Sequence, residues 1–445
     1  MVSENIAAIS TGLVASGVAV VRISGDSPLS IASKMFKPLG KTKVEEFEPY
    51  RMYVGEIQAD GFTDFGMCVY FKGPKSFTGE DVVEFHSHGG LAITKGILRK
   101  ILSLGARLAG NGEFTKRAFI NGKLSLSSAE GLIDMINSES VSGVKAGYYL
   151  YREKLTQEIV ALQDKITDVL SEIDVNMDFP EEDLEEASTT AVEQTLLEVT
   201  TRLKELLSTY RTGRQIKNGV RVGIVGKPNT GKSSMLNALL SYDKAIVSNV
   251  AGTTRDVVEG SIEISGVTFN FYDTAGIRES EDGIENLGVV LSKKVLNESD
   301  LLLFVVDSSN LTKDDEEIYS LIKDKNHLFI MNKSDVSDIK DKRADVYTSA
   351  KTGENLEQLK KKMFEKSVGA GIDLNGDFLC EERHFNALSL GYEKLMQAKN
   401  AVGSVPLDLL AIDVKDGWDA LGEISGKTAT EEIINNIFSK FCVGK

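Results

Sequence analysis

The sequence predicts a multidomain α/β protein in which an α+β domain is followed by a helical domain that a second α/β domain interrupts. Three observations support this prediction. The chain has 445 residues, too many for one hydrophobic core. Strand-like and helix-like patterns follow one another in the order α/β, helical, α/β, helical. Insertion at a surface loop, which compact domains tolerate, is the simplest arrangement that fits this order.

Residues 1–120 are expected to form the N-terminal α+β domain. Glycines separate short runs rich in β-branched and aromatic residues, a pattern typical of strands. These runs are "GVAVVRIS", "RMYVGEI", "DFGMCVYF" and "DVVEFHSH". One helix is expected among them, at "LAITKGILRKILSLG".

Residues 121–217 and 376–445 are expected to form the helical domain. Apolar residues recur every three or four positions between 155 and 173. Pro180 interrupts this pattern, and a second helix follows through "LLEVTTRLKELLSTY". The last helix lies in "TATEEIINNIFSKF", where Thr428 and Glu431 are expected to form a capping box.

Residues 218–375 are expected to form the inserted domain, because apolar strands alternate there with amphipathic helices. This alternation is typical of a parallel sheet with helical crossovers.

The composition narrows the possible functions. The chain has 51 basic and 66 acidic residues, a net charge of −15, which argues against a broad nucleic-acid-binding surface. A nucleic-acid partner would therefore meet a local basic patch or a second protein. Three cysteines fit a reducing compartment without a disulfide framework. No apolar run approaches the length of a membrane span, and the expected location is the cytoplasm.

The run "GIVGKPNTGKSS" at 223–234 matches the phosphate-binding loop of nucleoside triphosphatases. It follows an apolar strand and opens a helix, so its backbone N–H groups can surround a phosphate. Lys232 is expected to reach the β and γ phosphates, and the Ser233 hydroxyl to bind Mg²⁺. Thr254, in "VAGTTRD", is placed to bring a second hydroxyl to Mg²⁺.

Three further runs identify the nucleotide as GTP or GDP. "DTAG" at 273–276 follows a strand, where an acid suits the Mg²⁺ shell and the Gly276 N–H can meet the γ-phosphate. "NKSD" at 332–335 supplies the Asp335 carboxylate, which can accept two N–H bonds from guanine but not from adenine. "TSAK" at 348–351 would supply a backbone N–H to guanine O6.

Ile277 stands where signalling GTPases carry the glutamine that orients the attacking water. An alkyl side chain cannot polarise water, so another base is required. The acids of "ESEDGIENLG" are the nearest candidates, and we favour Glu285 among them. Taken singly, each of these acids also fits a solvated loop.

The whole chain resembles the MnmE (TrmE) family of tRNA modification GTPases. The resemblance rests on "VVRISG", "SFTGEDVVEFHSHGG", "GEFTKRAF", "GKPNTGKSS", "AIVSNVAGTTRD", "DTAGIRE", "NKSD" and the terminal "FCVGK". It implies a Ras-like P-loop GTPase domain inserted into an all-α domain. It also implies an N-terminal domain that is similar to tetrahydrofolate-binding domains and that dimerises.

The resemblance also implies the ligands of the GTP site. K⁺ takes the place of an arginine finger, two G domains of a homodimer close on each other, and Glu285 orients the water. The K⁺ ligands would be Asn229, Ser248, Val250 and Thr253. The full set of expected nucleotide contacts is Asn229, Thr230, Gly231, Lys232, Ser233, Ser234, Ser248, Asn249, Val250, Ala251, Gly252, Thr253, Thr254, Asp273, Thr274, Ala275, Gly276, Asn332, Lys333, Asp335, Ser349, Ala350 and Lys351.

A folate site is implied in the same way, for 5,10-methylene- or 5-formyl-tetrahydrofolate. Its residues would be Arg22, Glu84, Lys123 and Lys445. Cys442 would then stand beside the one-carbon unit as a nucleophile or covalent carrier, since a thiolate is the reactive form of cysteine. The alternative is that Cys442 is a buried apolar residue of the last helix. "STGLVASGVAV" lacks the Pro-Pro-Gly turn common in the family, which leaves the nearby loop geometry open.

The implied function is the addition of an aminomethyl or carboxymethylaminomethyl group to C5 of the tRNA wobble uridine. The implied partner is the FAD-dependent MnmG (GidA), in a heterotetramer or larger assembly that makes much of the tRNA contact. The acidic run "DFPEEDLEE" at 178–186 fits either a docking site for this partner or a solvated loop.

Two other functions stay open: a GTP-driven ribosome or RNA assembly factor, and a folate-dependent one-carbon transferase regulated by GTP. An assembly factor would need an RNA-binding module or a second GTPase domain, and the sequence shows neither. His86 and His88 in "FHSHGG" are expected to be structural rather than metal ligands.

Overall fold

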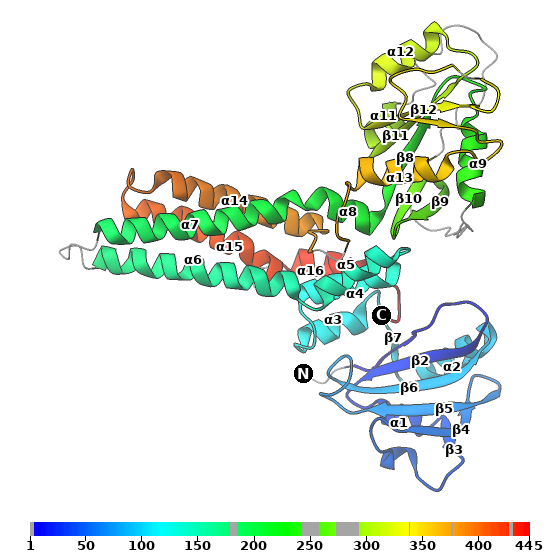
Figure 1. The fold of residues 1–445 in the computed structure, drawn as a ribbon. Coiled ribbons are helices and arrows are strands. Elements are labelled where there is room, and N and C mark those ends of the chain that lie inside the picture. The colour runs from blue at the N-terminus through cyan, green and yellow to red at the C-terminus, as the bar shows by residue number, and fades with distance from the viewer. Residues whose placement is uncertain are drawn as a thin grey trace. The chain divides into compact units, whose positions relative to one another are not determined.

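The computed structural model describes most of the chain, and the predictions for other residues stay untested. The described residues are 4–178, 185–242, 258–272, 293–337, 339–374, 377–426 and 430–445. The chain divides into two compact units. Figure 1 labels their helices and strands. The first contains residues 1–133, 150–171 and 415–445, and the second contains residues 134–149 and 172–414.

The first unit contains a seven-stranded sheet in the order β3-β4-β5-β6-β2-β1-β7. All neighbouring strands are antiparallel except β1 and β7, which are parallel. The strands are β1 (Ile6–Ile9), β2 (Ser16–Gly25), β3 (Phe36–Pro38), β4 (Met52–Gln58), β5 (Thr63–Phe71), β6 (Asp81–Gly89) and β7 (Arg107–Leu108). The four runs expected to be strands all lie in this sheet.

The sheet buries one face under helix α2 (Leu91–Ser103), as the sequence predicts. Val21, Ile23 and Phe85 point from the strands into a core that Ile97 and Ile101 of α2 complete. The strand side chains alternate between faces, so Arg22 and Glu84, which are register partners on β2 and β6, lie on the opposite face. A short helix, α1 (Pro28–Ala32), and a 3₁₀ turn at Val44–Glu46 adjoin the same core.

The C-terminal end of the chain packs against early helices of the first unit. Phe438 and Phe441 are buried with Leu126 and Ala129. The elements involved are α3 (Glu113–Ile120), α4 (Leu126–Asn137) and α16 (Glu431–Ser439). Farther along, Gln163 of α6 (Lys154–Asp178) donates to the Trp418 carbonyl of α15 (Leu407–Ser425) at 2.9 Å.

The predicted capping box of the last helix is wrong in its position. Thr430 is the N-cap of α16, and its side-chain oxygen accepts from the Ile433 N–H. The expected cap, Thr428, is two residues too early and lies outside the described residues. A threonine at either position offers the same hydroxyl, so the local sequence did not distinguish them.

The second unit contains a six-stranded sheet in the order β13-β12-β11-β8-β10-β9. Every pairing is parallel except that of β9 with β10, which confirms the predicted parallel α/β arrangement. The strands are β8 (Val220–Val225), β9 (Val258–Ile264), β10 (Val267–Tyr272), β11 (Leu301–Asp307), β12 (His327–Asn332) and β13 (Val346–Thr348). The helices that belong with them are α9 (Lys232–Tyr242), α11 (Lys293–Glu298), α12 (Lys313–Ile322) and α13 (Leu356–Ser367).

Helices precede and follow this sheet in the sequence. They are α5 (Val141–Tyr151), α7 (Glu185–Ser208), α8 (Tyr210–Asn218) and α14 (Glu382–Ala401). Within the second unit, α7 packs against α14 although the whole sheet separates them in the chain. No helix in the described ranges is long and apolar enough to span a membrane.

Candidate functional site

The phosphate loop follows β8 directly and leads into α9. Gly226 and Gly231 have φ angles of 148° and 91°, which residues other than glycine rarely adopt. A Cβ at Gly226 would lie 2.2 Å from the Val305 carbonyl oxygen, so neighbouring strand β11 also leaves no room there. The first residue of α9 is Lys232, and the loop therefore presents its backbone N–H groups at a helix N-terminus.

Lys232 is held close to the backbone of this loop. Its ammonium donates to the carbonyls of Gly226 and Lys227 at 2.9 and 2.8 Å. Burial lowers the pKa of the ammonium below its ordinary value. Ser233 and Ser234 follow on α9 with exposed side chains. This arrangement suits phosphate oxygens, which need a positioned cation and N–H donors.

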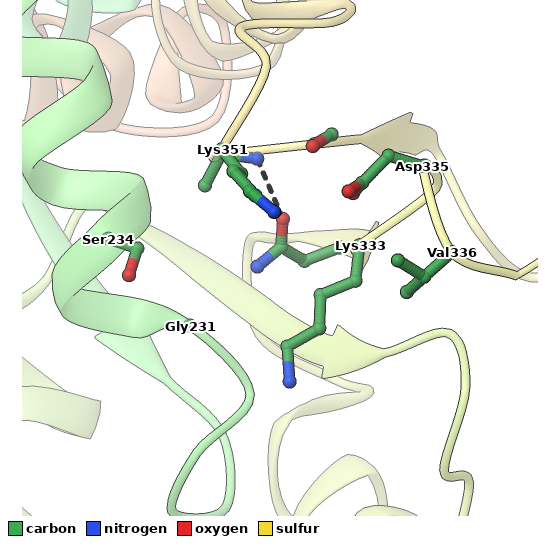
Figure 2. A pocket seen from close by; sticks show the side chains of 9 residues that line it. Gly231, Ser234, Lys333, Asp335, Val336 and Lys351 are labelled. Atoms are coloured by element: carbon green, nitrogen blue, oxygen red, sulfur yellow. Dashed lines mark hydrogen bonds between the residues drawn. The ribbon is translucent and has the colours of Figure 1, made fainter.

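A pocket of about 180 Å³ opens beside the loop. Gly231 and Ser234 line it from the α9 side, and residues at the end of β12 and after β12 and β13 line the remainder (Figure 2). The lining residues are Gly231, Ser234, Asn332, Lys333, Asp335, Val336, Ser349, Ala350 and Lys351. The structure thus brings the first motif together with "NKSD" and "TSAK", as the sequence predicts.

Asn332 joins these three segments. Its amide nitrogen donates to the Thr230 carbonyl at 2.9 Å, and its amide oxygen accepts from the Ala350 N–H at 3.1 Å. The side chain is almost fully buried, so each of these bonds is protected from water. Asn332 therefore fixes the spacing between the phosphate loop and the loop expected to contact guanine O6.

Lys333 makes a second connection between the motifs. Its ammonium donates to the Asn229 carbonyl at 3.0 Å and to Asp307 at 2.6 Å. Burial acts to raise the pKa of Asp307, but hydrogen bonds from Lys333 and Ser309 hold it below its ordinary value. Asp335, two residues after Lys333, lines the pocket with a carboxylate that can accept two N–H bonds from guanine (Figure 2).

Several expected site residues lie outside the described residues, so the structure says nothing about their placement. They are Ser248, Asn249, Val250, Ala251, Gly252, Thr253, Thr254, Asp273, Thr274, Ala275, Gly276 and Glu285. The same holds for most of the acidic run at 178–186.

Sequence reasoning missed three residues that support the nucleotide motifs: Lys227, Asp307 and Asp315. Asp307 ends β11, and an acid at the carboxyl end of a central parallel strand was a usable signal. Lys227 and Asp315 form an ion pair with a separation of 2.8 Å, although they are far apart in the sequence. No local pattern indicates that pair.

A second polar site lies on the face of the N-terminal sheet opposite the core with α2. The Arg22 Nε donates to Glu84 at 2.7 Å, and His86 lies 3.3 Å from the other oxygen of the same carboxylate. Burial acts to raise the pKa of Glu84, but His86 and Arg22 together hold it below its ordinary value. The Arg22 guanidinium also lies 5.6 Å from the ring centres of Phe77 and Phe114.

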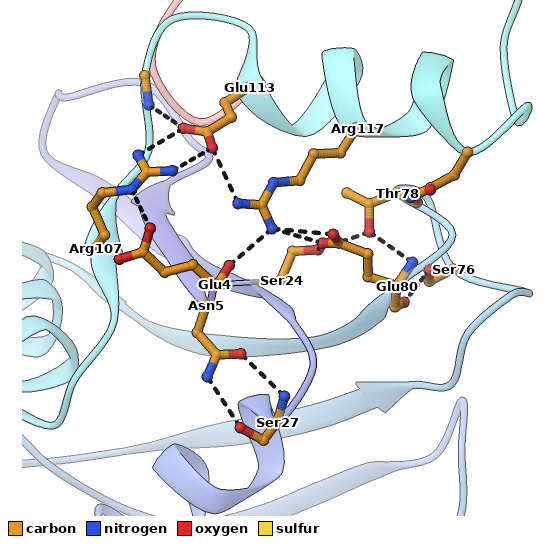
Figure 3. A network of polar contacts seen from close by, with 12 residues as sticks. Glu4, Asn5, Ser24, Ser27, Ser76, Thr78, Glu80, Arg107, Glu113 and Arg117 are labelled. Atoms are coloured by element: carbon orange, nitrogen blue, oxygen red, sulfur yellow. Dashed lines mark hydrogen bonds and ion pairs between the residues drawn. The ribbon is translucent and has the colours of Figure 1, made fainter. Parts of the chain in front are cut away.

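Helix α3 is fixed over this face by a network of charged side chains (Figure 3). Arg117 of α3 contacts Glu80 at 3.0 Å and Glu113 at 3.1 Å. Glu113 also pairs with Arg107 of β7 at 2.6 Å. Ser24 of β2 donates to Glu80 at 2.7 Å. The network holds α3 and the loop before β6 in fixed positions beside Arg22.

The C-terminal tail contacts the loop before α3 and the end of β1. The Gly112 N–H donates to the Cys442 carbonyl at 3.4 Å, and Val443 forms a bridge with Asn111. A Cβ at Gly444 would lie 2.2 Å from the Ile9 carbonyl oxygen, so the tail runs against β1. Ile9 is the register partner of Val21, the neighbour of Arg22.

The alternative interpretation of Cys442 is wrong. Helix α16 ends at Ser439, and the Cys442 side chain is exposed rather than buried in the last helix. Lys123 follows α3 and lies near the loop before β6, since a Cβ at Gly79 would lie 3.4 Å from the Lys123 Cγ. Arg22 and Glu84 are in contact, whereas no ion pair joins either of them to Lys123 or Lys445 in the described structure.

Comparisons with known proteins agree with the motifs. Family models of the MnmE helical domain and of the GTP-binding protein TrmE N-terminus match residues 126–442 and 5–123. The tRNA modification GTPase MnmE of Clostridioides difficile (strain 630) is 37% identical over 457 residues, which cover 100% of both chains. That of Thermoanaerobacter pseudethanolicus is 38% identical over 462 residues, again 100% of both chains.

The G domain of the FeoB iron transporter of T. maritima is among the solved structures that match. It is 28% identical, and the match covers 33% of this chain and 98% of that one, with a TM-score of 0.26. The full-length relatives and the helical-domain match are sufficient by themselves: the chain belongs to the MnmE family of tRNA modification GTPases.

Proposed function

We propose that this GTP-hydrolysing enzyme modifies C5 of the wobble uridine in certain tRNAs, adding an aminomethyl or carboxymethylaminomethyl group. One observation supports this most directly. The exposed thiol of Cys442 lies on a tail that contacts the loop before α3 and the end of β1, the strand next to the one that carries Arg22, in a chain that also has a guanine pocket. A GTP-driven assembly factor would have no use for an exposed thiol on this tail.

The pair fits a reduced folate. Among the described residues, each Glu84 oxygen has one polar partner, Arg22 or His86, and each oxygen can accept a further N–H. The two side chains of the pair are 21% and 12% exposed, so the carboxylate is sheltered but reachable. Bound there, 5,10-methylene- or 5-formyl-tetrahydrofolate would supply a one-carbon unit. Arg22 and Glu84 would orient the folate ring, and Lys123 and Lys445 would meet its carboxylates.

Cys442 would act on the one-carbon unit or shape its immediate site. Its exposed Sγ is the nucleophilic atom of the tail.

Mg²⁺ and K⁺ would serve GTP hydrolysis. Ser233, exposed at the start of α9, would bind Mg²⁺ together with Thr254. Asn229 would offer an amide oxygen to K⁺, alongside Ser248, Val250 and Thr253. Asn229 is exposed and has a φ angle of 62°, and Lys333 fixes its carbonyl. Oxygen ligands suit both hard cations, which would stabilise charge developing on the phosphates. Glu285 would orient the water.

The proposed assembly is a homodimer that works with the FAD-dependent partner MnmG in the cytoplasm. A strip of apolar side chains on β4 and β5, opposite the core of the N-terminal sheet, supports the dimer. Met52, Val54 and Phe65 in this strip are 48%, 44% and 51% exposed. Exposed apolar strips of this kind mark protein interfaces, and we assign this one to a second copy of the chain. The partner would make much of the contact with tRNA, because this chain has a net charge of −15.

The proposed organisation of the chain follows the same family. We propose an N-terminal folate-binding-like domain at 1–120 and a GTPase domain at 218–375 inserted into a helical domain at 121–217 and 376–445. The packing of α7 against α14 supports the insertion, because these helices stand on either side of the GTPase domain in the sequence.

Mass spectrometry of tRNA nucleosides tests the function. Cells that lack the protein would be complemented with the wild type, Cys442→Ser or the control Ser439→Ala, at matched expression. We expect the wild type and the control to restore the C5-modified uridine and Cys442→Ser to fail. If Cys442→Ser restores it, the thiol is not part of the chemistry. If the wild type restores nothing, the proposal is wrong and an assembly factor becomes the better interpretation.

A further inference from the structure

Lys227 lies within the phosphate loop, but its side chain serves a different part of the structure. The ammonium donates to the Asn310 carbonyl at 2.6 Å, to the Thr312 hydroxyl at 3.0 Å and to the Asp315 carboxylate at 2.8 Å. All three acceptors belong to the start of α12 and the segment before it. The positive charge of Lys227 is therefore committed to α12 rather than to a phosphate.

Asp315 depends on this contact. Its side chain is 4% exposed, and its Oδ2 accepts from Lys227 and from the Thr312 backbone N–H, the latter at 2.9 Å. Among the described residues, no donor reaches its Oδ1. A buried carboxylate is costly unless a counter-charge and hydrogen bonds compensate it. Lys227 is the cation in contact with this one.

The backbone of Lys227 connects the ion pair to the nucleotide site. Its carbonyl accepts from the Lys232 ammonium at 2.8 Å and from the Thr230 hydroxyl at 3.0 Å. Lys232 is the cation that serves phosphate in this motif. The contact of the Lys227 side chain with the start of α12 therefore also fixes the Lys227 carbonyl, which accepts from Lys232.

We propose that Lys227 is a positioning residue for guanine nucleotide binding. Its pair with Asp315 anchors the phosphate loop to the N-terminus of α12, so the loop is ordered before a nucleotide arrives. If the loop is already ordered, less of the binding free energy is lost in ordering it when the nucleotide binds. The proposal concerns the GTP site alone and is independent of the proposed folate and tRNA chemistry.

The test uses the full-length protein and four variants: Lys227→Met, Lys227→Arg, the double variant Lys227→Met/Asp315→Asn, and Lys313→Met as a control. Lys313 is an exposed lysine at the start of the same helix. The readouts are the Kd of a fluorescent guanine nucleotide, KM and kcat for GTP, and the thermal midpoint. The double variant removes the lone buried charge, while the introduced amide oxygen can still accept from the Thr312 N–H.

We expect Lys227→Met to raise the Kd and KM about tenfold, the loss typical of one charge-assisted contact, and to change kcat less. Lys227→Arg is expected to recover most of the affinity, and Lys313→Met to match the wild type. In the double variant the thermal midpoint should recover while the Kd stays high. The proposal is overturned if Lys227→Met binds as the wild type does. It is also overturned if the double variant recovers its affinity, because the buried charge alone would then explain the loss.

Discussion

The Lys217 ammonium, near the end of α8, donates to Asp134 of α4 across 2.8 Å and also contacts Glu381, the residue just before α14. One cation thus lies between two carboxylates, all of them largely buried, with side chains 22%, 11% and 13% exposed. Lys217 precedes the sheet of the second unit in the sequence and Glu381 follows it. The three side chains therefore tie together the two ends of that domain.

The first prediction concerns pH. Burial and the neighbouring Glu381 raise the pKa of Asp134 to about 8, so the folded state holds a proton that the unfolded chain releases near its ordinary value of 3.8. A raised folded pKa gives stability that is complete below the unfolded value and is lost as the pH rises through the folded one. Between pH 7 and pH 9 the free energy of unfolding of the second unit should fall by about 1 kcal/mol.

Denaturant unfolding of the wild type and Asp134→Asn at both pH values checks this. The amide cannot ionise, so the variant should lose less stability over the interval. An equal loss in both proteins would place the titrating group elsewhere.

The second prediction concerns Lys217 itself. Its replacement by Met leaves the buried Glu381 carboxylate, with the protonated Asp134 carboxyl beside it, without a cation, which should destabilise the second unit by about 3–5 kcal/mol near neutral pH. Lys204→Met, at an exposed position on α7, is the matched control and should change the stability by less than about 0.5 kcal/mol. Thermal unfolding followed by circular dichroism measures both. A small loss in Lys217→Met would mean that water or repacking replaces the cation.

The third prediction concerns the choice of base. Asp335 can accept from both guanine N–H groups, whereas an asparagine amide presents one donor to them. Asp335→Asn should therefore weaken GDP binding roughly 10–100-fold, and it should favour xanthine, whose second carbonyl can accept from the amide. Competition between GDP and XDP measures the change. Asp324→Asn, an exposed control, should leave the preference for guanine intact.

The sequence was sufficient to predict the three runs that line the described pocket, namely the phosphate loop, "NKSD" and "TSAK". Lys232 begins α9 and Asn332 ends β12, as these motifs require. Each motif combines the residues that set the local backbone conformation with those that contact the nucleotide, so both can be recognised from one short run. The broad succession of strand-rich and helical segments was also predictable, since the apolar periods of strands and helices differ, but the short strands β1, β3 and β7 were not predicted.

The supporting contacts were not predictable. Lys227 and Asp315 are 88 positions apart, and Lys217 and Glu381 are 164 apart. Such pairs depend on which strands become neighbours in the sheet, and neither partner lies in a run with a recognisable period. The exposure of Cys442 belongs to the same class, because it depends on where α16 ends and on how the tail meets β1.

The fourth prediction concerns K⁺. Asn229 is proposed to hold K⁺ rather than the smaller Na⁺, and the bound K⁺ would stabilise the charge on the phosphates. Exchange of KCl for NaCl should therefore slow GTP hydrolysis by the wild type. Asn229→Ala should hydrolyse GTP slowly in either salt and still bind GDP, since its carbonyl, which Lys333 contacts, is unchanged. Turnover in the two salts, with Asn218→Ala as the control, gives the comparison. Equal rates of the wild type in KCl and NaCl would remove the role assigned to Asn229.

The last prediction concerns the N-terminal pair. Arg22→Met removes the only guanidinium that contacts Glu84 in the described structure and leaves that carboxylate with His86 alone. The pKa of Glu84 should rise as a result, because Arg22 helps to hold it down against burial. Binding of 5-formyl-tetrahydrofolate, measured by calorimetry, should weaken by about tenfold or more if the pair orients the folate.

The matched control is Arg99→Met, which breaks an exposed pair with Asp60 in the same unit. Both variants should hydrolyse GTP at the wild-type rate, because the nucleotide pocket belongs to the other compact unit. Wild type that binds no folate would refute the folate site as a whole. If the wild type and Arg22→Met bind the folate equally well, the proposed folate site stands, but the role of Arg22 is only to neutralise Glu84.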